Sequence, residues 1–330
     1  MGVKDTVTIR YLRQNDIFAD AFNYFIYNGR KVIVPERLEE LDTREVDVPY
    51  GGENGAEQPV QKTRDVIKTL MAMTDGRAAY LVLAIEAQSN IHYAMAVKNM
   101  VYDALQYAKQ VEEAIASHRA SGDYKNVGSD EYLSGFMKQD RLMPVVTLVI
   151  YFDSKKWDGP RTIHEMFSVQ DEELLSYVPD YKINLIEPAM MQKEDFDKFS
   201  TTLKEVLTFI KYSKDADGLK EALDADPNFH HLGREEVDVL NACVNADLHL
   251  SESEATIDVC EAIRVLNQRA ADEAAEKATE KAMEKAEKKR ITTLVESINN
   301  LKKNMGWTSE KAMEILGLSE SDRKAAAPFL

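Results

Sequence analysis

The chain has 330 residues, of which 44% are hydrophobic, and its formal net charge is −16. This length allows one large domain with an appendage. The acidic balance argues against tight nucleic-acid binding through bulk charge, although it leaves room for a local basic groove. The two cysteines, Cys243 and Cys260, lack CxxC spacing, so neither a zinc site nor a disulfide framework is expected.

The beginning of the sequence lacks the apolar core of a signal peptide, and no run reaches about eighteen apolar residues. We therefore expect a soluble, cytoplasmic protein that makes no contact with a membrane.

The first predicted element is a helix over residues 14–28, where apolar residues recur at helical spacing and Asn28-Gly29 provides a stop. Short strands or extended pieces are expected at 31–34 and 45–48. The later elements are a long helix after Gln88, a strand at 144–153 covered on both faces, a strand at 181–187 and a helix at 195–213. This order predicts a mixed α/β sheet.

A β-hairpin is predicted at residues 66–85, where two apolar runs flank Asp75-Gly76. If these two residues form the turn, counting outward sets Asp65 opposite Glu86. Like charges in that position repel each other, so a cation between them is the expected reason for such a pair. Gln88 shares the face of Glu86 because strand side chains alternate. Two carboxylates and an amide oxygen are hard ligands suited to Mg²⁺ or Mn²⁺.

The last part of the sequence predicts helices. Residues 270–290 are almost only Ala, Glu, Lys and Arg, which indicates a solvated spacer or a weak coiled coil. A short helical hairpin is expected at the end, with Thr308 or Ser309 starting one helix. Ser319 and Asp322 have capping-box spacing for the other.

Several segments, in this order, resemble the PD-(D/E)XK nuclease superfamily, and more closely its Rpn branch of recombination-promoting nucleases, also named transposases. The likeness covers roughly residues 10–215. It is carried by Asp20-Ala-Phe-Asn-Tyr-Phe25, Arg64-Asp65, Ile85-Glu-Ala-Gln88, Met95–Tyr102, Val145–Phe152 and Trp157-Asp-Gly-Pro160. The resemblance implies a restriction-endonuclease-like mixed sheet flanked by helices, with a helical C-terminal tail.

The resemblance and the pattern of the last part of the sequence together predict four segments in the chain. They are a PD-(D/E)XK nuclease-like domain at 1–215, a helical extension at 216–268, a charged Ala/Glu/Lys-rich helix at 269–303 and a short helical hairpin at 304–330.

The family's roles can be carried over to matching positions. Asp65 and Glu86 resemble the metal ligands, and Asp20 resembles the helix acid that completes the metal shell. Gln88 stands where the wider superfamily has lysine and the Rpn branch commonly has glutamine. Two positions depart from the family: Asn23 replaces a lysine, and Lys98 stands where arginine is common.

The chemistry of these side chains suggests how they would act. An amide does not titrate, so Gln88 is expected to orient the attacking water or to offer its carbonyl as a ligand. Lys98 is the candidate for the cation that stabilises the transition state, whereas Lys68 would lie on the opposite face of the hairpin from Asp65. Tyr102 is expected in the core.

Other sites find less support. His230-His231 has no ligand-spaced partners, so no metal site is expected there. Neither cysteine has a clear histidine partner and no Gly-x-Ser-x-Gly elbow occurs, which argues against a nucleophilic hydrolase. No Walker loop is present either.

The leading hypothesis is an Mg²⁺-dependent DNA endonuclease, with Mn²⁺ able to substitute, that acts in a bacterial cytoplasm and on the nucleoid when bound to DNA. Recombination-promoting or transposase-related activity is implied by the resemblance. The alternative is an inactive nuclease fold that works as an interaction module through its tail, which Asn23, Gln88 and the acidic surface favour. Cutting both strands would need two sites, so a homodimer formed through the tail stays open.

Overall fold

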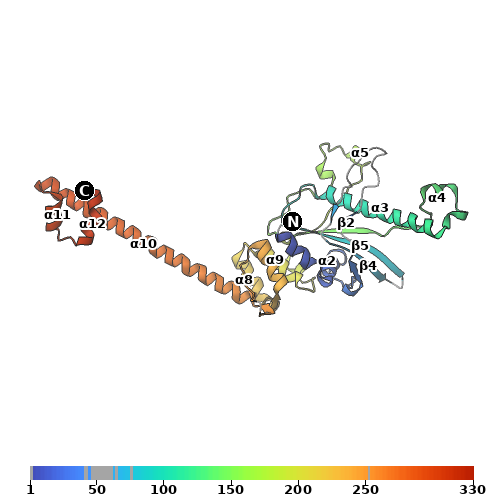
Figure 1. Ribbon diagram of the computed structural model, residues 1–330, viewed down its shortest axis with the longest axis horizontal. Helices are drawn as coiled ribbons and strands as arrows, with labels where there is room; N and C mark the ends of the chain where they lie inside the picture. Colours follow the sequence, from blue (N-terminus) through green and yellow to red (C-terminus); the bar gives the residue numbers. More distant parts are fainter. Residues whose placement is uncertain (1–2, 41–43, 46–61, 64–65, 75–76, 252) are drawn as a thin grey trace. The chain divides into compact units, whose positions relative to one another are not determined.

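The computed structural model describes residues 3–40, 44–45, 62–63, 66–74, 77–251 and 253–330 (Figure 1). The chain divides into two compact units, Met1–Ala262 and Ile263–Leu330. In the described segments, no helix is both long enough and apolar enough to cross a membrane.

The first unit is built on a five-stranded sheet of order β1-β4-β5-β6-β7. Its strands are β1 (Leu38–Glu40), β4 (Val66–Thr74), β5 (Arg77–Gln88), β6 (Val145–Tyr151) and β7 (Asn184–Ile186). β1 pairs antiparallel with β4, and β4 pairs antiparallel with β5. β5 pairs parallel with β6, and β6 pairs parallel with β7. A parallel pair needs a long crossover connection, which α3 (Met95–Ser121) provides between β5 and β6. The mixed α/β sheet expected from the sequence is confirmed.

Helices from both ends of the first unit pack together beside this sheet. They are α1 (Val3–Leu12), α2 (Asn15–Tyr27), α7 (Leu203–Tyr212), α8 (Ala216–Ala225) and α9 (Arg234–Val244). α1 contacts α2, α9 and β5, and α7 contacts α2, α8 and α9. Their largest fully buried side chains include Tyr11, Phe18 and Phe22, so α1, which the sequence did not predict, supplies part of the core.

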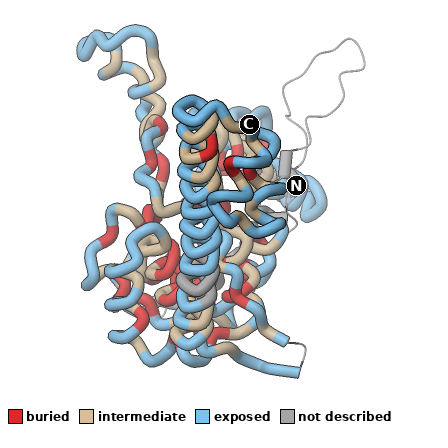
Figure 2. Tube along the Cα trace, turned by 90° about the vertical axis from the view of Figure 1, so that its left-hand side faces the viewer, coloured by how far each residue is buried: buried red, intermediate tan, exposed pale blue. Residues whose placement is uncertain are grey.

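Shorter elements connect these parts. The short helices are α4 (Ser129–Ser134), α5 (Glu172–Leu175) and α6 (Lys193–Phe196). Two small ladders also form, β2 (Arg44–Glu45) with β3 (Lys62–Thr63) and β8 (Leu232–Gly233) with β9 (Thr256–Ile257). Among the described residues, most of the buried ones belong to the helices and the sheet of the first unit (Figure 2).

The strand predictions hold best where the chain is most apolar. Every residue of β6 except Val146 is buried, which confirms a strand covered on both faces. β7 lies within the strand expected at 181–187. Of the two alternatives expected at 31–34, a short strand or an extended piece, the strand is not formed, and the first strand begins at Leu38. The reason is Asn23, whose side chain binds the backbone of Val32 and Ile33 in place of a strand partner.

The helix expected at 195–213 is interrupted. α6 ends at Phe196 and α7 begins at Leu203. Between them, the backbone N–H groups of Ser200 and Thr201 donate to the carboxylate of Asp20. Because these donors are used by a side chain from α2, they are not available to a continuous helix.

The second unit contains most of α10 (Val259–Met305), followed by α11 (Ser309–Ile315) and α12 (Glu320–Ala326). Its buried cluster is small, consisting of Ile298, Ala312 and Ala326. Thr308 caps α11 and Ser319 caps α12, as predicted from their spacing. Residues 275–290 of α10 are exposed (Figure 2), which agrees with their polar composition.

Candidate functional site

The candidate site lies at the end of β5, the second strand of the predicted hairpin. The β4–β5 register runs from Val66 opposite Ile85 to Thr74 opposite Arg77, which confirms the predicted pairing over these strands. Asp65 and the side chain of Glu86 lie outside the described residues. The backbone of Glu86 pairs with Val149 of β6. Position 86 is therefore held by its pairing with β6, which limits its backbone movement.

Gln88 is the last residue of β5. It pairs with Tyr151 of β6, and its carbonyl accepts a hydrogen bond of 2.8 Å from the N–H of Phe152. Its side chain is half-buried. The side-chain amide of Gln88 is thus attached to a hydrogen-bonded backbone at the point where the parallel strands β5 and β6 end. Ligands commonly bind at such strand ends in α/β folds.

The first turn of α3 is seated next to this strand end. Met95 and Ala96 are fully buried in a cluster with Val149 and Tyr151 of β6. Lys98 follows in the same turn, and its ammonium lies 5.6 Å from the ring centre of Tyr102. Only 6% of the surface of Tyr102 is exposed, so its expected core position is confirmed. The helix is anchored by its apolar face, which fixes the backbone position of Lys98.

A buried hydrogen-bond network holds α3 on the sheet. The carboxylate of Asp103 accepts hydrogen bonds of 2.5 Å from the Thr147 hydroxyl of β6 and 2.6 Å from the Tyr181 hydroxyl. Asn184 of β7 donates to the carbonyl of Thr147 at 2.9 Å. These bonds connect α3, β6 and β7. They set how far α3, and with it Lys98, is turned about its own axis, and the sequence offered no sign of them.

An aromatic cluster lies beside the same strand ends. The rings of Tyr151 and Trp157 meet edge to face, with centres 5.3 Å apart. Burial, and then the charges of nearby carboxylates led by Asp153, raise the pKa of Tyr151 to about 12, so its phenol stays neutral at physiological pH. The backbone N–H of Trp157 donates to the buried carboxylate of Glu187, which also pairs with Arg161. The Trp157-Asp-Gly-Pro segment is thereby fixed against the sheet.

Asp20 is buried between α2 and the start of α7, where its carboxylate accepts hydrogen bonds from other protein groups. Its two oxygens accept hydrogen bonds of 2.7–3.0 Å from the N–H and hydroxyl groups of Ser200 and Thr201. Its exposure is only 3%. These contacts give Asp20 a structural part, that of tying α2 to the start of α7. Its role in binding metal stays a prediction.

Asn23, which replaces the family's lysine, is also structural. Its amide donates to the carbonyl of Ile33 at 2.9 Å, and its carbonyl accepts from the N–H groups of Val32 and Ile33 at 3.0 and 2.8 Å. The side chain is 5% exposed. A lysine could not accept these two N–H groups, so the departure from the family is matched by a local backbone arrangement.

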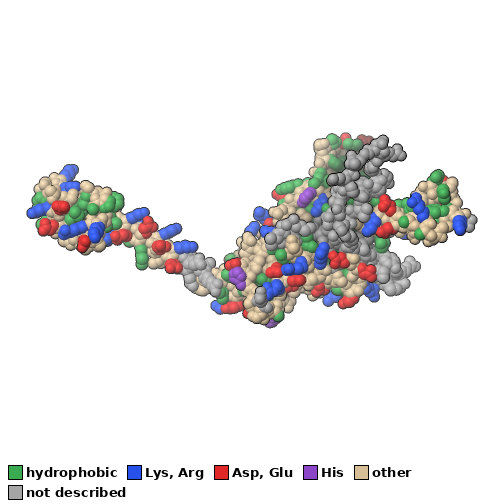
Figure 3. Space-filling view, in the orientation of Figure 1, with side chains coloured by type: hydrophobic (Ala, Val, Ile, Leu, Met, Phe, Trp, Pro, Cys, Tyr) green, Lys and Arg blue, Asp and Glu red, His purple; other side chains and the backbone are tan. Residues whose placement is uncertain are grey.

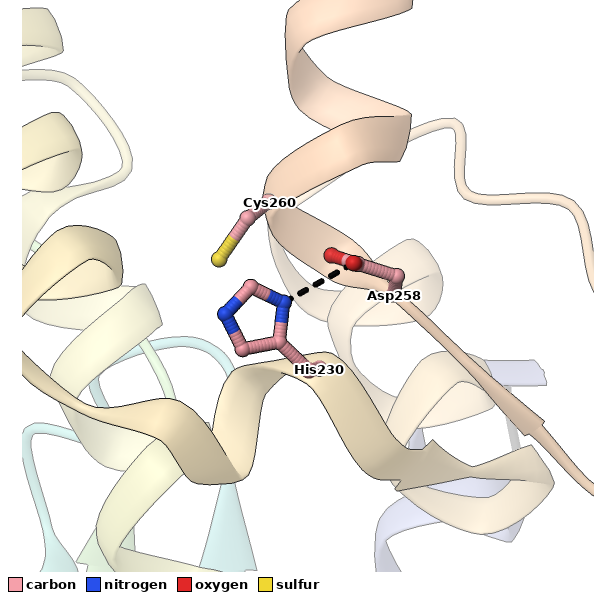
Figure 4. A group of neighbouring side chains, drawn as sticks. All are labelled: His230, Asp258 and Cys260. Carbon is pink, nitrogen blue, oxygen red and sulfur yellow. Dashed lines mark hydrogen bonds and ion pairs between the residues drawn. The ribbon is translucent and has the colours of Figure 1, made fainter.

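One cluster of metal-binding side chain types was missed by the sequence. His230, Asp258 and Cys260 bring one ligand atom each to within 4.8 Å of one another (Figure 4). The expectation that His230 has no ligand-type partners, and that neither cysteine lies near a histidine, is therefore wrong. His230 precedes Asp258 by 28 positions and Cys260 by 30, and the β8–β9 pairing joins the two segments. No local motif could have revealed them.

The fold and site define a mixed α/β domain in which a hairpin strand leads through a crossover helix into a parallel strand. The profile of the family described as "Putative transposase, YhgA-like" matches residues 61–228, just over half of the chain. The chain belongs to this family, which is of the PD-(D/E)XK-type Rpn kind, so the resemblance is confirmed. No curated protein and no solved structure matches the chain significantly.

Proposed function

We propose that this protein is an Mg²⁺-dependent DNA endonuclease with a PD-(D/E)XK fold. One observation carries the proposal: the family segment contains a hairpin whose second strand ends at Glu86 and Gln88 and then continues through α3 into parallel β6. Val66 and Ile85, the sequence neighbours of Asp65 and Glu86, pair directly. This is the order of acid-bearing strand, helix and strand on which the family resemblance rests.

The donor set fits a hard divalent ion. Asp65 and Glu86 would supply carboxylate oxygens and Gln88 an amide oxygen, which suit Mg²⁺, with Mn²⁺ as a substitute. A bound Mg²⁺ would supply Lewis-acid catalysis and lower the pKa of a water molecule. Cys260 and the histidines have no part in this set.

The remaining groups would act on the substrate. The amide of Gln88, held by the β5–β6 pairing, can orient the attacking water but cannot remove its proton. The ammonium of Lys98, on the anchored first turn of α3, would offset the negative charge that develops on the phosphate. We place Lys98 here instead of a strand lysine because Gln88 occupies that position.

DNA is the proposed substrate, bound through local contacts. Acidic and basic side chains are interspersed over the face drawn in Figure 3, and the net charge of the chain is −16. Binding through bulk charge is therefore not the proposed mode. Double-strand cutting would need two sites, and the exposed residues 275–290 of α10 are the proposed surface for pairing two copies.

The test is cleavage of supercoiled plasmid by the full chain with Mg²⁺, Mn²⁺ or EDTA. The Asp65→Ala/Glu86→Ala variant should lose metal-dependent nicking. A matched control, Glu172→Ala/Glu173→Ala, removes two exposed acids from α5 and should cut like the parent. Equal cleavage by the parent and the hairpin variant would refute the proposal.

A different outcome would favour the interaction-module alternative. If neither protein cuts with any metal, and calorimetry detects no Mn²⁺ binding that depends on Glu86, the hairpin has no catalytic ion. The tail would then be the part of the chain to test for partners.

A further inference from the structure

A second cluster of metal-ligating side chains is far in sequence from the proposed nuclease residues. It combines an imidazole, a carboxylate and a thiol. His230 is the next-to-last residue of the 3-10 helix Pro227–His231, and Asp258 and Cys260 lie at the start of α10. Leu232 of β8 pairs with Ile257 of β9, so the backbone next to His230 and the backbone next to Asp258 are joined by a ladder. Figure 4 shows the thiol of Cys260 and the carboxylate of Asp258 both next to the ring of His230.

Hydrogen bonds already orient this cluster. The Nδ1 atom of His230 lies 2.8 Å from an oxygen of Asp258, whose other oxygen accepts from the N–H of Glu261 at 2.9 Å. The thiol of Cys260 lies 3.6 Å from the carbonyl of Leu223. The side chains of His230 and Asp258 are 46% and 43% exposed. An ion could reach them from solvent without any opening of the fold.

Two carboxylates, those of Asp258 and Asp224, add negative charge near the thiol of Cys260. Burial, followed by the charges of Asp258 and Asp224, raises the pKa of the Cys260 thiol. The Glu261 N–H, and then His230, hold the pKa of Asp258 below its ordinary value, so it is a carboxylate at neutral pH. A metal ion would offset this negative charge and would release the thiol proton as it binds.

We propose that His230, Asp258 and Cys260 bind a divalent transition-metal ion of the Zn²⁺ type. Imidazole, carboxylate and thiolate are all zinc ligands, whereas a thiolate is too soft for Mg²⁺. Tetrahedral coordination at the usual bond lengths sets donor atoms roughly 3.3–3.7 Å apart. The observed atoms lie between 2.8 and 4.8 Å apart, so small side-chain rotations suffice.

The fourth coordination position would be taken by water, because the structure offers three protein ligands in this cluster. The ion would join the segment that ends at His231 to the first turn of α10. Its role is therefore to fix the backbone at the point where α10 begins.

The experiment uses the full chain, stripped with EDTA and titrated with Co²⁺ as a coloured substitute for Zn²⁺. We expect a thiolate-to-cobalt charge-transfer absorption in the near ultraviolet that saturates at one Co²⁺ per chain, and loss of that absorption when Zn²⁺ is added. Mg²⁺ at the same concentration should not displace Co²⁺. A titration without any thiolate absorption would overturn the proposal.

The chain supplies a matched control for two of the ligands. Cys260→Ser should abolish the thiolate absorption, while Cys243→Ser, in α9, should keep it. His230→Gln should weaken Co²⁺ binding by at least the roughly 10–100-fold that loss of an outer-shell partner causes. His231→Gln, at the neighbouring position, should bind as the parent does.

Circular dichroism of each variant separates a lost ligand from a lost fold. If Cys260→Ser is unfolded, the proposal is tested by comparing Co²⁺ binding of the His230→Gln and His231→Gln variants. Equal weakening by both histidine variants, or a thiolate absorption that persists in a folded Cys260→Ser protein, would contradict the assignment.

Discussion

Two aspartates, Asp20 and Asp258, both accept hydrogen bonds at the start of a helix, yet their surroundings differ in kind. Asp20 belongs to α2 and reaches the residues before α7, whereas Asp258 directly precedes α10. Asp20 is 3% exposed, and protein N–H and hydroxyl groups donate to both of its oxygens just before α7. The side chain of Asp258 is 43% exposed and meets the N–H of Glu261 and the imidazole of His230 just before α10. The sequence predicted a metal role for the first and none for the second.

The difference shows what decides whether a carboxylate is available to an ion. A carboxylate that accepts several hydrogen bonds in the interior would have to give them up to bind a metal, and the buried donors would lose their partners. A half-exposed carboxylate beside an imidazole and a thiol loses little. On this basis the environment of Asp258 suits an ion better than that of Asp20.

The largest expected effect is on stability when Asp20 is removed. Asp20→Ala would leave the N–H and hydroxyl groups of Ser200 and Thr201 without their acceptor, and we expect a loss of about 3 kcal/mol in the free energy of unfolding, measured with urea. Asp16→Ala, an exposed acid on the same helix, should cost less than about 1 kcal/mol. An Asp20 variant that keeps its stability but loses plasmid cleavage would instead support the metal role.

The next effect concerns Zn²⁺ and the cluster of Asp258. Zn²⁺ at a hundredfold excess over its dissociation constant should raise the free energy of unfolding of the full chain by about 2.7 kcal/mol, if it binds the folded state alone. The Asp258→Asn variant, measured at the same Zn²⁺ concentration, should show a clearly smaller gain because one of three ligands is weakened. A stabilisation by Zn²⁺ that is equal in both proteins would place the ion elsewhere.

A smaller effect is expected when Asp258→Asn is measured in EDTA. The pair of Asp258 with His230 is about half exposed, and such surface pairs contribute about 0–1 kcal/mol. We therefore expect urea unfolding of the metal-free variant to lie within about 1 kcal/mol of the parent. A loss as large as that of Asp20→Ala would mean that Asp258 is structural too, and the contrast between the two aspartates would fail.

The parts of the fold that the sequence predicted are those set by local patterns. The Asp75-Gly76 turn residues and their flanking apolar runs were enough to predict the pairing from Val66–Ile85 to Thr74–Arg77. The apolar run at 144–153 predicted a buried β6, and the spacing of Thr308 and Ser319 predicted two helix caps. Each of these is signalled by a pattern within a short stretch of the chain, even where the paired residues, such as Val66 and Ile85, are further apart.

The parts that were missed depend on contacts between distant segments. Asn23 takes the place of a strand partner for Val32 and Ile33, and Asp20 interrupts a helix nearly two hundred positions away. The cluster at Asp258 forms because β8 and β9 pair. Such tertiary contacts override local propensity and leave no periodic signal in the sequence. The roles of Asp65, Glu86, Gln88 and Lys98 stay predictions.

The smallest expected effect concerns His118. This histidine contacts two carboxylates that lie at opposite nitrogens of its ring, so they do not face one shared ion position. The Nδ1 atom of His118 lies 3.1 Å from Asp123, and its Nε2 atom lies 3.0 Å from Asp140, on the other side of the ring. Hydrogen bonds to Asp123, and then to Asp140, raise the pKa of His118. Because the pKa is raised in the folded state, the resulting stabilisation is complete below the unfolded value of about 6.5 and is lost as pH rises through the folded pKa.

An NMR titration of the ring protons should therefore give His118 a midpoint above about 6.5, and Asp140→Asn should lower it. Asp130→Asn, an exposed acid in α4, should leave the midpoint unchanged. In the same spectra Zn²⁺ should shift the ring signals of His230 and spare those of His118, because two acids on opposite ring nitrogens cannot share one ion with the imidazole. If Zn²⁺ moved both histidines alike, proximity of acids alone would explain binding, and the distinction drawn from the geometry of His230, Asp258 and Cys260 would be wrong.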